Sequence, residues 1–530
     1  MIINYRTRLL LMKLERSKNA MRNASFGIIN RLVGIICPFI VRTIFIKVLS
    51  VEYLGLNSLF SSILTVLNLT ELGFSSAIVF CMYKPIADDD TDAINALLYF
   101  YKKAYKYIGI IIFTIGVCLI PFLEHLINGT YPNNINLVVV YLVYLFNTVL
   151  SYFLFGYLSS LISAFQREDL ISKVSIITSL AMYGTQIITL ILTRNYYVFL
   201  SIMLIFTVVN NLRTAIIAKK YFPQYIAKGE LEKKYKKQIK EKVSGLIISK
   251  ICSVSRNAFD SIFISMFLGL VDTAIYNNYY YIMNSIVAIT VVITTSITAG
   301  AGNSVVTESE YKNYCDMNRM NYIYMWLAGW FTTCLLCLYQ PFMKLWVGEK
   351  FLFPIGCVIL ICIYFYVLKM GDIRFIYDQA KGLWWENRYR ALGEAIANIT
   401  LNYILGKRFG IEGIILATLI SLFVFNFCLG SQIIFKKYFI NENVRDYYLA
   451  HFKYACTTTL VCGITFVICS KMPEGVLGIV IKFMICMILP NVLYLIIYKK
   501  QKIHKDSFNW LLNKLPIKVQ LILNRGKGHY

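Results

Sequence analysis

Residues 26–49 read FGIINRLVGIICPFIVRTIFIKVL, a block that is apolar at most positions. A helix needs about 20 consecutive apolar residues to cross the hydrocarbon core of a bilayer. Similar blocks recur as far as residue 498 with short polar breaks between them, and 58% of the chain is hydrophobic while only 15% is charged. A soluble domain would leave much of this apolar surface exposed to water. The chain is therefore predicted to be an all-α, polytopic membrane protein.

The polar breaks divide the chain into about 14 predicted transmembrane helices. In the first half, spans are predicted at residues 26–49, 55–83, 107–127, 135–164, 173–193 and 196–218. In the second half, they are predicted at residues 244–268, 274–300, 322–341, 352–376, 391–406, 411–435, 452–470 and 476–498. Because the number of spans is even, both termini are expected on the same side of the membrane.

The distribution of positive charge indicates which side that is. The net charge is +25, and the basic residues gather near both termini and in alternate loops, above all in residues 219–242. Loops on the cytoplasmic side are enriched in Lys and Arg. We therefore expect a multi-pass protein of the cytoplasmic membrane with both termini in the cytoplasm. Anchoring to anionic headgroups explains these stretches better than a specific partner, and no nucleic acid is predicted to bind.

The seventh and eighth predicted spans resemble the first and second. Residues 44–46 followed by 54–57 read IFI and LGLN, and residues 262–264 followed by 274–277 read IFI and AIYN. Such a repeat predicts two pseudo-symmetric six-helix lobes related by an axis along the membrane normal, followed by two C-terminal helices. The predicted segments are a basic N-terminal segment (1–25), an N-lobe (26–218), a basic linker (219–243), a C-lobe (244–436), the last two helices (437–498) and a basic tail (499–530).

The motifs of nucleotide and metal sites are missing from the sequence. No P-loop occurs, and the 14 cysteines and four histidines are scattered. The pair Cys334 and Cys337 lacks the second pair or the histidines that zinc would need, so the cysteines are interpreted as small core residues. The predicted external loops are too short to hold a catalytic site. We therefore predict no enzymatic activity, no metal and no cofactor, although a proton or sodium gradient or the membrane potential could drive transport.

Charged residues inside a membrane helix cost about 2.5–3.5 kcal/mol each on insertion scales, so they usually face a cavity or a partner. In the first span, Arg31 and Arg42 lie on one face together with Pro38, at 100° per residue. Lys47 points the other way and is expected to reach the headgroups. One face of this helix therefore presents two guanidinium groups.

Three further spans have a polar face. The residues are Asn57, Asn68 and Glu71 in the second span, Arg256, Asn257 and Asp260 in the seventh, and Tyr281 and Asn284 in the eighth. Arg256 and Asp260 are one helical turn apart and able to pair. These residues either line a transport cavity between the lobes, or form interhelical hydrogen bonds and a structural ion pair.

Two groups of charged residues also have more than one interpretation. Glu71 and Asp260 are either carboxylates that couple an ion gradient or partners that hold the arginines. A charged cluster near the cytoplasmic end of the tenth span either gates the inner mouth or forms an ordinary salt-bridge network, and we favour the network. This cluster comprises Lys369, Asp372, Arg374 and Asp378.

Four segments of the chain resemble a known family. They are residues 16–20 (RSKNA), 42–43 (RT), 52–60 (EYLGLNSLF) and 70–74 (TELGF). They resemble the repeat-unit flippases of bacterial polysaccharide synthesis, of the O-antigen and capsule type, in the multidrug/oligosaccharidyl-lipid/polysaccharide (MOP) exporter superfamily. The resemblance implies a two-lobed body of 12 helices, here with two more, that moves lipid-diphosphate-linked oligosaccharide from the inner to the outer leaflet by alternating access.

The residues suit such a substrate. One guanidinium group can bind two phosphate oxygens at once. Arg31, Arg42 and Arg256 each carry such a group. Sugars need amides, hydroxyls and aromatic faces, which residues of the polar faces offer. The resemblance also implies membrane lipids and the polymerase and glycosyltransferases of the same pathway as partners. The alternatives are an ion-coupled drug or cation exporter of the same superfamily, a membrane glycosyltransferase or polymerase, and an assembly scaffold.

Overall fold

The computed structural model describes residues 16–68, 74–236, 239, 256 and 258–514. All the regular elements in these ranges are helices, which confirms the all-α prediction. Ten of the described helices are long and apolar enough to cross a membrane, and a bent pair makes eleven. Three shorter apolar helices, Val51–Leu67, Phe74–Ala87 and Ala258–Phe267, add to these.

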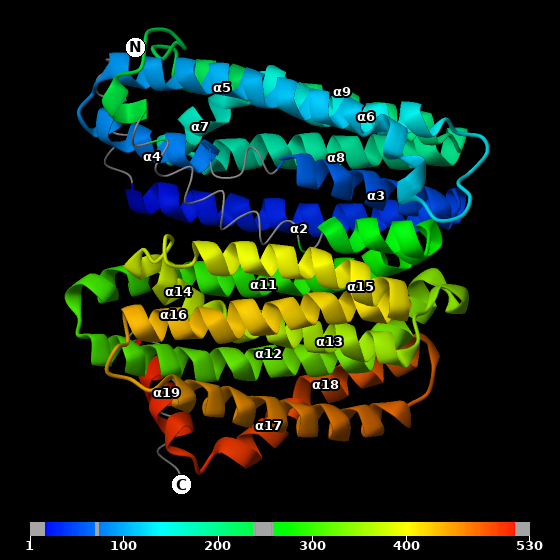
Figure 1. Ribbon diagram of the computed structural model, residues 1–530, viewed down its shortest axis with the longest axis vertical. Coiled ribbons are helices and arrows are strands. Elements are labelled where there is room, and N and C mark those ends of the chain that lie inside the picture. The colour runs from blue at the N-terminus through cyan, green and yellow to red at the C-terminus, as the bar shows by residue number, and fades with distance from the viewer. Residues whose placement is uncertain (1–15, 69–73, 237–238, 240–255, 257, 515–530) are drawn as a thin grey trace. The chain divides into compact units, whose positions relative to one another are not determined.

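The chain divides into two compact units, Met1–Ala274 and Ile275–Tyr530. The first unit contains the segment Ala258–Phe267 and eight long or short helices, coloured blue to green in Figure 1. These helices are α2 (Arg16–Val48), α3 (Val51–Leu67), α4 (Phe74–Ala87), α5 (Thr91–Cys118), α6 (Leu137–Phe153), α7 (Tyr157–Ala164), α8 (Glu168–Thr193) and α9 (Tyr196–Tyr221). Within this unit α2 packs along α8, α8 along α9, and α3 against α6.

The second unit holds the rest of the chain, coloured green to red in Figure 1. Its helices are α11 (Leu270–Thr307, which begins in the first unit), α12 (Glu310–Val347), α13 (Ile355–Met370), α14 (Asp372–Lys381), α15 (Arg388–Ser421), the π-helix η5 (Leu422–Leu429), α16 (Gly430–Lys437), α17 (Val444–Ser470), α18 (Gly475–Tyr498) and α19 (Lys502–Lys514). Here α12 packs against α13, α17 and α18, and α17 packs against α18. The predicted lobe limits, which place a linker at 219–243, remain a prediction.

Short polar side chains begin several of these helices. Asp90 accepts a hydrogen bond from the backbone N–H of Ala93 at 2.9 Å, and Asn136 accepts one from Val139 at 3.1 Å. Such caps satisfy backbone N–H groups that have no partner within the helix. Asn136 thus marks a helix start close to the predicted one at residue 135, whereas α5 begins at Thr91 and ends at Cys118, so the predicted span 107–127 starts 16 residues too late.

Glycine separates the eleventh and twelfth predicted spans. The helical run from Arg388 to Lys437 is long enough for both, and it is interrupted at Gly410, where φ is 58° and ψ is −133°. Residues with a Cβ rarely adopt this backbone conformation. The break thus falls where the spans 391–406 and 411–435 were divided.

Two other predicted spans each correspond to two described helices. The span 55–83 is made of α3 and α4, with residues 69–73 outside the described ranges. The span 135–164 is made of α6 and α7, which meet at an angle of 51° beside Phe155, a residue with a φ of 58°. Of the seventh span, 244–268, Arg256 and residues 258–268 are described. Hydropathy did not detect the bend between α6 and α7 because the residues on both sides of it are apolar.

Several helices are longer than the predicted spans. Both α11 and α12 have 38 residues, so each is about 57 Å long, against about 30 Å for the hydrocarbon core. Polar residues continue these helices beyond the apolar block. Hydropathy marks the part of a helix that suits lipid, whereas backbone hydrogen bonding decides where the helix ends.

Candidate functional site

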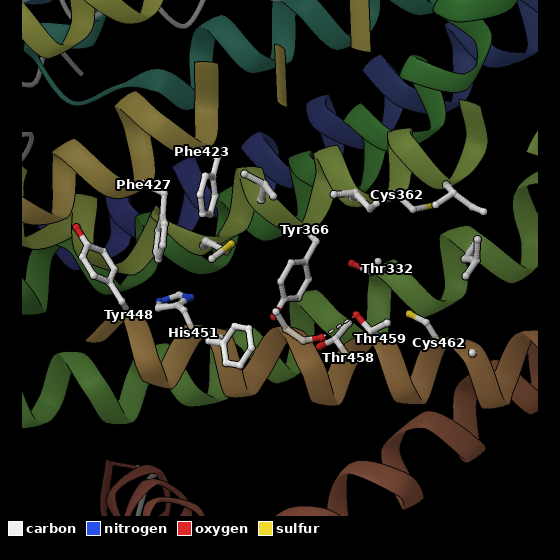
Figure 2. Close-up of a pocket in the computed structure, with 18 of the residues that line it drawn as sticks. Thr332, Cys362, Tyr366, Phe423, Phe427, Tyr448, His451, Thr458, Thr459 and Cys462 are labelled. Atoms are coloured by element: carbon white, nitrogen blue, oxygen red, sulfur yellow. Dashed lines mark hydrogen bonds between the residues drawn. The ribbon is translucent and has the colours of Figure 1, made fainter. Parts of the chain in front are cut away.

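An apolar pocket lies within the second unit. It has a volume of about 750 Å³, is partly open, and is lined by residues of α12, α13, η5 and α17. Figure 2 shows the side chains that face it from these helices, which include Tyr366, Phe423, Phe427, His451, Thr458 and Cys462. Pockets that bind small organic ligands usually measure about 300–1,000 Å³ and are mostly apolar. The cavity is therefore of the size and character of a ligand site.

Most polar groups at this pocket are engaged with protein partners, whereas His451 Nδ1 is buried without a hydrogen-bond partner among the described residues. His451 is 1% exposed, and its Nε2 lies 2.9 Å from Asn321 Nδ2. Thr458 Oγ1 accepts a hydrogen bond from the hydroxyl of Tyr494 at 2.9 Å. The ring of His451 also lies 4.9 Å from that of Phe427, edge to face. Apart from His451 Nδ1, the pocket offers mainly hydrocarbon and aromatic surface, which suits a lipid tail better than a sugar or a phosphate.

Sequence analysis did not single out this pocket. The thirteenth span was predicted to begin at residue 452, one residue after His451, whereas α17 begins at Val444. Cavity-lining residues that are aromatic or aliphatic have no distinct pattern in a sequence that is apolar throughout. The one available signal was a histidine beside a predicted membrane helix, which is unusual enough to indicate a specific role.

The two predicted arginines of the first span lie on one continuous helix. α2 runs through Pro38 without ending, with Arg31 exposed and Arg42 half-buried. Lys47 is exposed in the last turn of the same helix. An arginine well inside a helix of membrane-spanning length usually faces a cavity, a charged ligand or a partner.

The predicted amides of the second span hold two helices together. The hydroxyl of Tyr144 on α6 donates a hydrogen bond to Asn57 Oδ1 on α3, and the hydroxyl of Tyr152 donates one to Asn68 Oδ1 at 3.1 Å. Both amides therefore make the interhelical hydrogen bonds that were one of the two interpretations of this face. Glu71, the third polar residue of this face, lies outside the described residues.

The remaining predicted residues are divided between the units. Arg256 is 7% exposed and Asp260 is fully buried, and both belong to the first unit, whereas Asn257 lies outside the described residues. In the second unit, α11 carries Tyr281, which is half-buried, and Asn284, which is exposed. The structure thus brings Asn57 and Asn68 to one helix contact and places Arg256 and Asp260 in a buried position.

The charged cluster of the tenth span is a network of paired side chains. Lys369 Nζ lies 2.8 Å from Asp372 Oδ2, and Arg374 Nη1 lies 2.9 Å from Asp378 Oδ2. Arg374 also donates to Asn426 Oδ1 at 3.1 Å, which joins α14 to η5. These contacts are the ion pairs that the network interpretation expects, and the gating interpretation stays a prediction.

Comparison with solved structures identifies the fold of the chain. No protein-family model and no curated protein matches the chain. Among solved structures, the lipid II flippase MurJ in its inward closed conformation matches with a TM-score of 0.63 and 12% identity, over 90% of this chain and 98% of that one. An inward-facing multidrug resistance MATE family transporter of the MOP superfamily matches with a TM-score of 0.60 and 13% identity, over 78% and 98%. A MOP superfamily transporter from Pyrococcus furiosus matches with a TM-score of 0.53 and 12% identity, over 81% and 98%. The chain therefore has the fold of these transporters.

Proposed function

We propose that this protein is a flippase that moves lipid-diphosphate-linked oligosaccharide units from the inner to the outer leaflet of the cytoplasmic membrane. It would act by alternating access and serve the biosynthesis of a capsule, an O-antigen, a teichoic-type polymer or an exopolysaccharide. One fold match, over 90% of this chain, is to a lipid II flippase, and lipid II is itself a lipid-linked saccharide. The observation that carries the proposal for this chain is a large apolar pocket in one unit, together with arginines on a membrane helix of the other.

The arginines and the pocket would bind different parts of such a substrate. A diphosphate group requires cations, and a guanidinium is well suited to it because it donates two parallel hydrogen bonds to phosphate oxygens. Arg31 and Arg42 on α2 supply this chemistry, with Arg256 as a third candidate. A polyprenyl or acyl tail requires apolar surface shielded from water, and the pocket bounded by Tyr366, Phe427 and α17 supplies it.

Amides and aromatic side chains would contact the sugars. Tyr281 and Asn284 on α11 remain candidates for this role. Asn57 and Asn68 make hydrogen bonds to α6, so a sugar would have to compete with Tyr144 and Tyr152 for their carbonyl oxygens.

We expect both termini in the cytoplasm, an ion gradient or the membrane potential as the source of energy, and the polymerase of the pathway as the protein that receives the product.

An ion-coupled exporter of drugs or cations is the second candidate, because MATE transporters share the fold. A cationic substrate would favour carboxylates and aromatic faces along its path. The helix α2 instead carries Arg31 and Arg42, and its residues Arg16–Val48 include no acidic residue. This charge favours an anionic substrate.

The experiment is to measure in which leaflet the lipid-linked oligosaccharide resides in cells that lack the protein. A membrane-impermeant lectin or glycosidase, applied to intact spheroplasts, reports only the outer leaflet. We expect the substrate to accumulate in the inner leaflet, and the wild-type gene to restore outer-leaflet labelling. Normal labelling of the outer leaflet without the protein would refute translocation, and drug-efflux assays would then test the exporter.

A further inference from the structure

Three thiols from three different helices meet inside the second unit. The Sγ atoms of Cys337 on α12, Cys469 on α17 and Cys486 on α18 all lie within 4.8 Å of one another. All three side chains are buried, with exposures of 4%, 2% and 0%. The three positions are far apart in the sequence, so only the packing of α12, α17 and α18 brings them together.

A fourth cysteine adjoins this group. Cys334 lies one turn before Cys337 on α12 and packs against the same cluster. Its Sγ also lies 3.9 Å from the backbone carbonyl oxygen of Cys486, which accepts a hydrogen bond from Trp330 Nε1 at 2.8 Å. The face of α12 that carries Trp330, Cys334 and Cys337 is thereby held against α18. The pair Cys334 and Cys337, which has no partner pair nearby in the sequence, acquires Cys469 and Cys486 as partners in the fold.

The arrangement has the donor set and the dimensions of a metal site. Zinc binds cysteine sulfur at about 2.3 Å, so sulfurs around one ion lie about 3.8 Å apart in tetrahedral geometry. Sulfurs that are already within 4.8 Å of one another need to move by about 1 Å or less. Thiolates select soft ions such as Zn²⁺ and Cu⁺ over Mg²⁺ and Ca²⁺. A buried structural site of this kind needs no open coordination position for water.

We propose that Cys337, Cys469 and Cys486, with Cys334 as a fourth donor, bind a thiophilic metal ion, with Zn²⁺ as the expected occupant. The thiols that coordinate the ion release their protons to solvent as it binds, and no electron is transferred. A divalent ion offsets two of the thiolate charges and so lowers the cost of burying them, which leaves a net charge of −1 with three thiolates and −2 with four. The ion would fasten α17 and α18 to α12 and so tie the last two long helices to the rest of the unit.

The first test measures the metal content of the full-length protein, purified in detergent without chelators. After incubation with ZnSO₄ and gel filtration, mass spectrometry should find about one Zn²⁺ or Cu⁺ per chain, as in structural sites of closed coordination. The single variants Cys337→Ser, Cys469→Ser and Cys486→Ser should each lose most of this metal. The control is Cys462→Ser, because Cys462 is also a buried cysteine on α17 but bonds to Thr333 at 3.2 Å and is not one of the three clustered thiols. This variant should keep the metal.

A second measurement needs no variant and so does not depend on whether a mutant folds. Alkylation of the metal-loaded protein with a maleimide, followed by peptide mass spectrometry, should show Cys337, Cys469 and Cys486 protected until a chelator is added. Two results would overturn the proposal. One is a wild-type protein that holds no more metal than Cys337→Ser, and the other is protection of these thiols that a reductant relieves and a chelator does not.

Discussion

Tyr152 on α6 donates a hydrogen bond to Asn68 Oδ1 at the end of α3 across 3.1 Å, and two turns earlier on α6 Tyr144 donates one to Asn57. The polar face of α3 is thus joined to its neighbour at two points along its length. Interhelical hydrogen bonds in membranes contribute on average about 0.6 kcal/mol each. The two hydrogen bonds therefore stabilise the unit only modestly, and they also fix the position of α3 against α6.

The bond between Tyr144 and Asn57 can be tested by a double-mutant cycle. Tyr144→Phe and Asn57→Ala should each lower the stability in detergent, and the double variant should lose less than the sum, with a coupling energy of about 0.6–1.7 kcal/mol. Thermal unfolding of the four proteins checks this. Strict additivity would show that the two side chains do not interact.

Arginines on α2 should affect transport according to their position. Arg42→Ala is expected to abolish outer-leaflet labelling in the spheroplast assay while the protein stays inserted and expressed, because a guanidinium that meets the diphosphate is lost. Lys47→Ala, on the same helix but exposed near its end, should be nearly silent. Equal effects of the two substitutions would contradict the claim that one face of α2 lines the path.

Filling the apolar pocket should impair the handling of a lipid tail. Thr459→Trp places a large side chain into the space that Thr459 lines, and we expect weaker binding of a long-chain polyprenyl diphosphate to the purified protein. The matched control is Leu460→Trp, because Leu460 is the next residue of α17, is 55% exposed and does not line the pocket. If both variants bind the lipid as the wild type does, the pocket does not hold the tail.

Gly55 lies where α3 approaches the start of α11 too closely for a side chain. A Cβ at this position would be 2.1 Å from the backbone oxygen of Leu270, and backbone cannot move aside as a flexible side chain can. Gly55→Ala should therefore cost about 1–3 kcal/mol or more of stability. Gly184→Ala on α8, where a Cβ would meet nothing within 4 Å, should be neutral or slightly stabilising. Melting temperatures in detergent compare the two.

The buried pair of Arg374 and Asp378 should be sensitive to the loss of one partner. Both side chains are at most 3% exposed, and removing one charge of such a pair typically costs about 3–5 kcal/mol because the other stays buried without compensation. Arg374→Ala should therefore lower the melting temperature sharply. Lys312→Ala, which breaks an exposed pair with Glu308, should change it little. Similar melting temperatures for these two variants would contradict the structural role of the network.

The sequence predicted the elements better than it predicted their contacts. The break between spans 391–406 and 411–435 lies at Gly410 in the structure, because glycine and charge near the break are local signals. The 51° bend between α6 and α7 was missed although Gly156 lies at it, because one glycine within an apolar block with no charge beside it does not end a predicted span. At the candidate site, the arginines of α2 could be identified because charge is rare in a membrane helix. The pocket beside His451 could not, because its lining resembles any other apolar helix surface.

The sequence by itself determined that the chain forms helices of membrane length, because every backbone polar group in lipid must be satisfied within a helix or a closed sheet. It also determined where charge enters the apolar blocks. Only the tertiary structure decided which of those residues meet. Asn57 pairs with Tyr144, and Cys337 meets Cys469 and Cys486, because helix packing joins positions that hydropathy and spacing treat as independent.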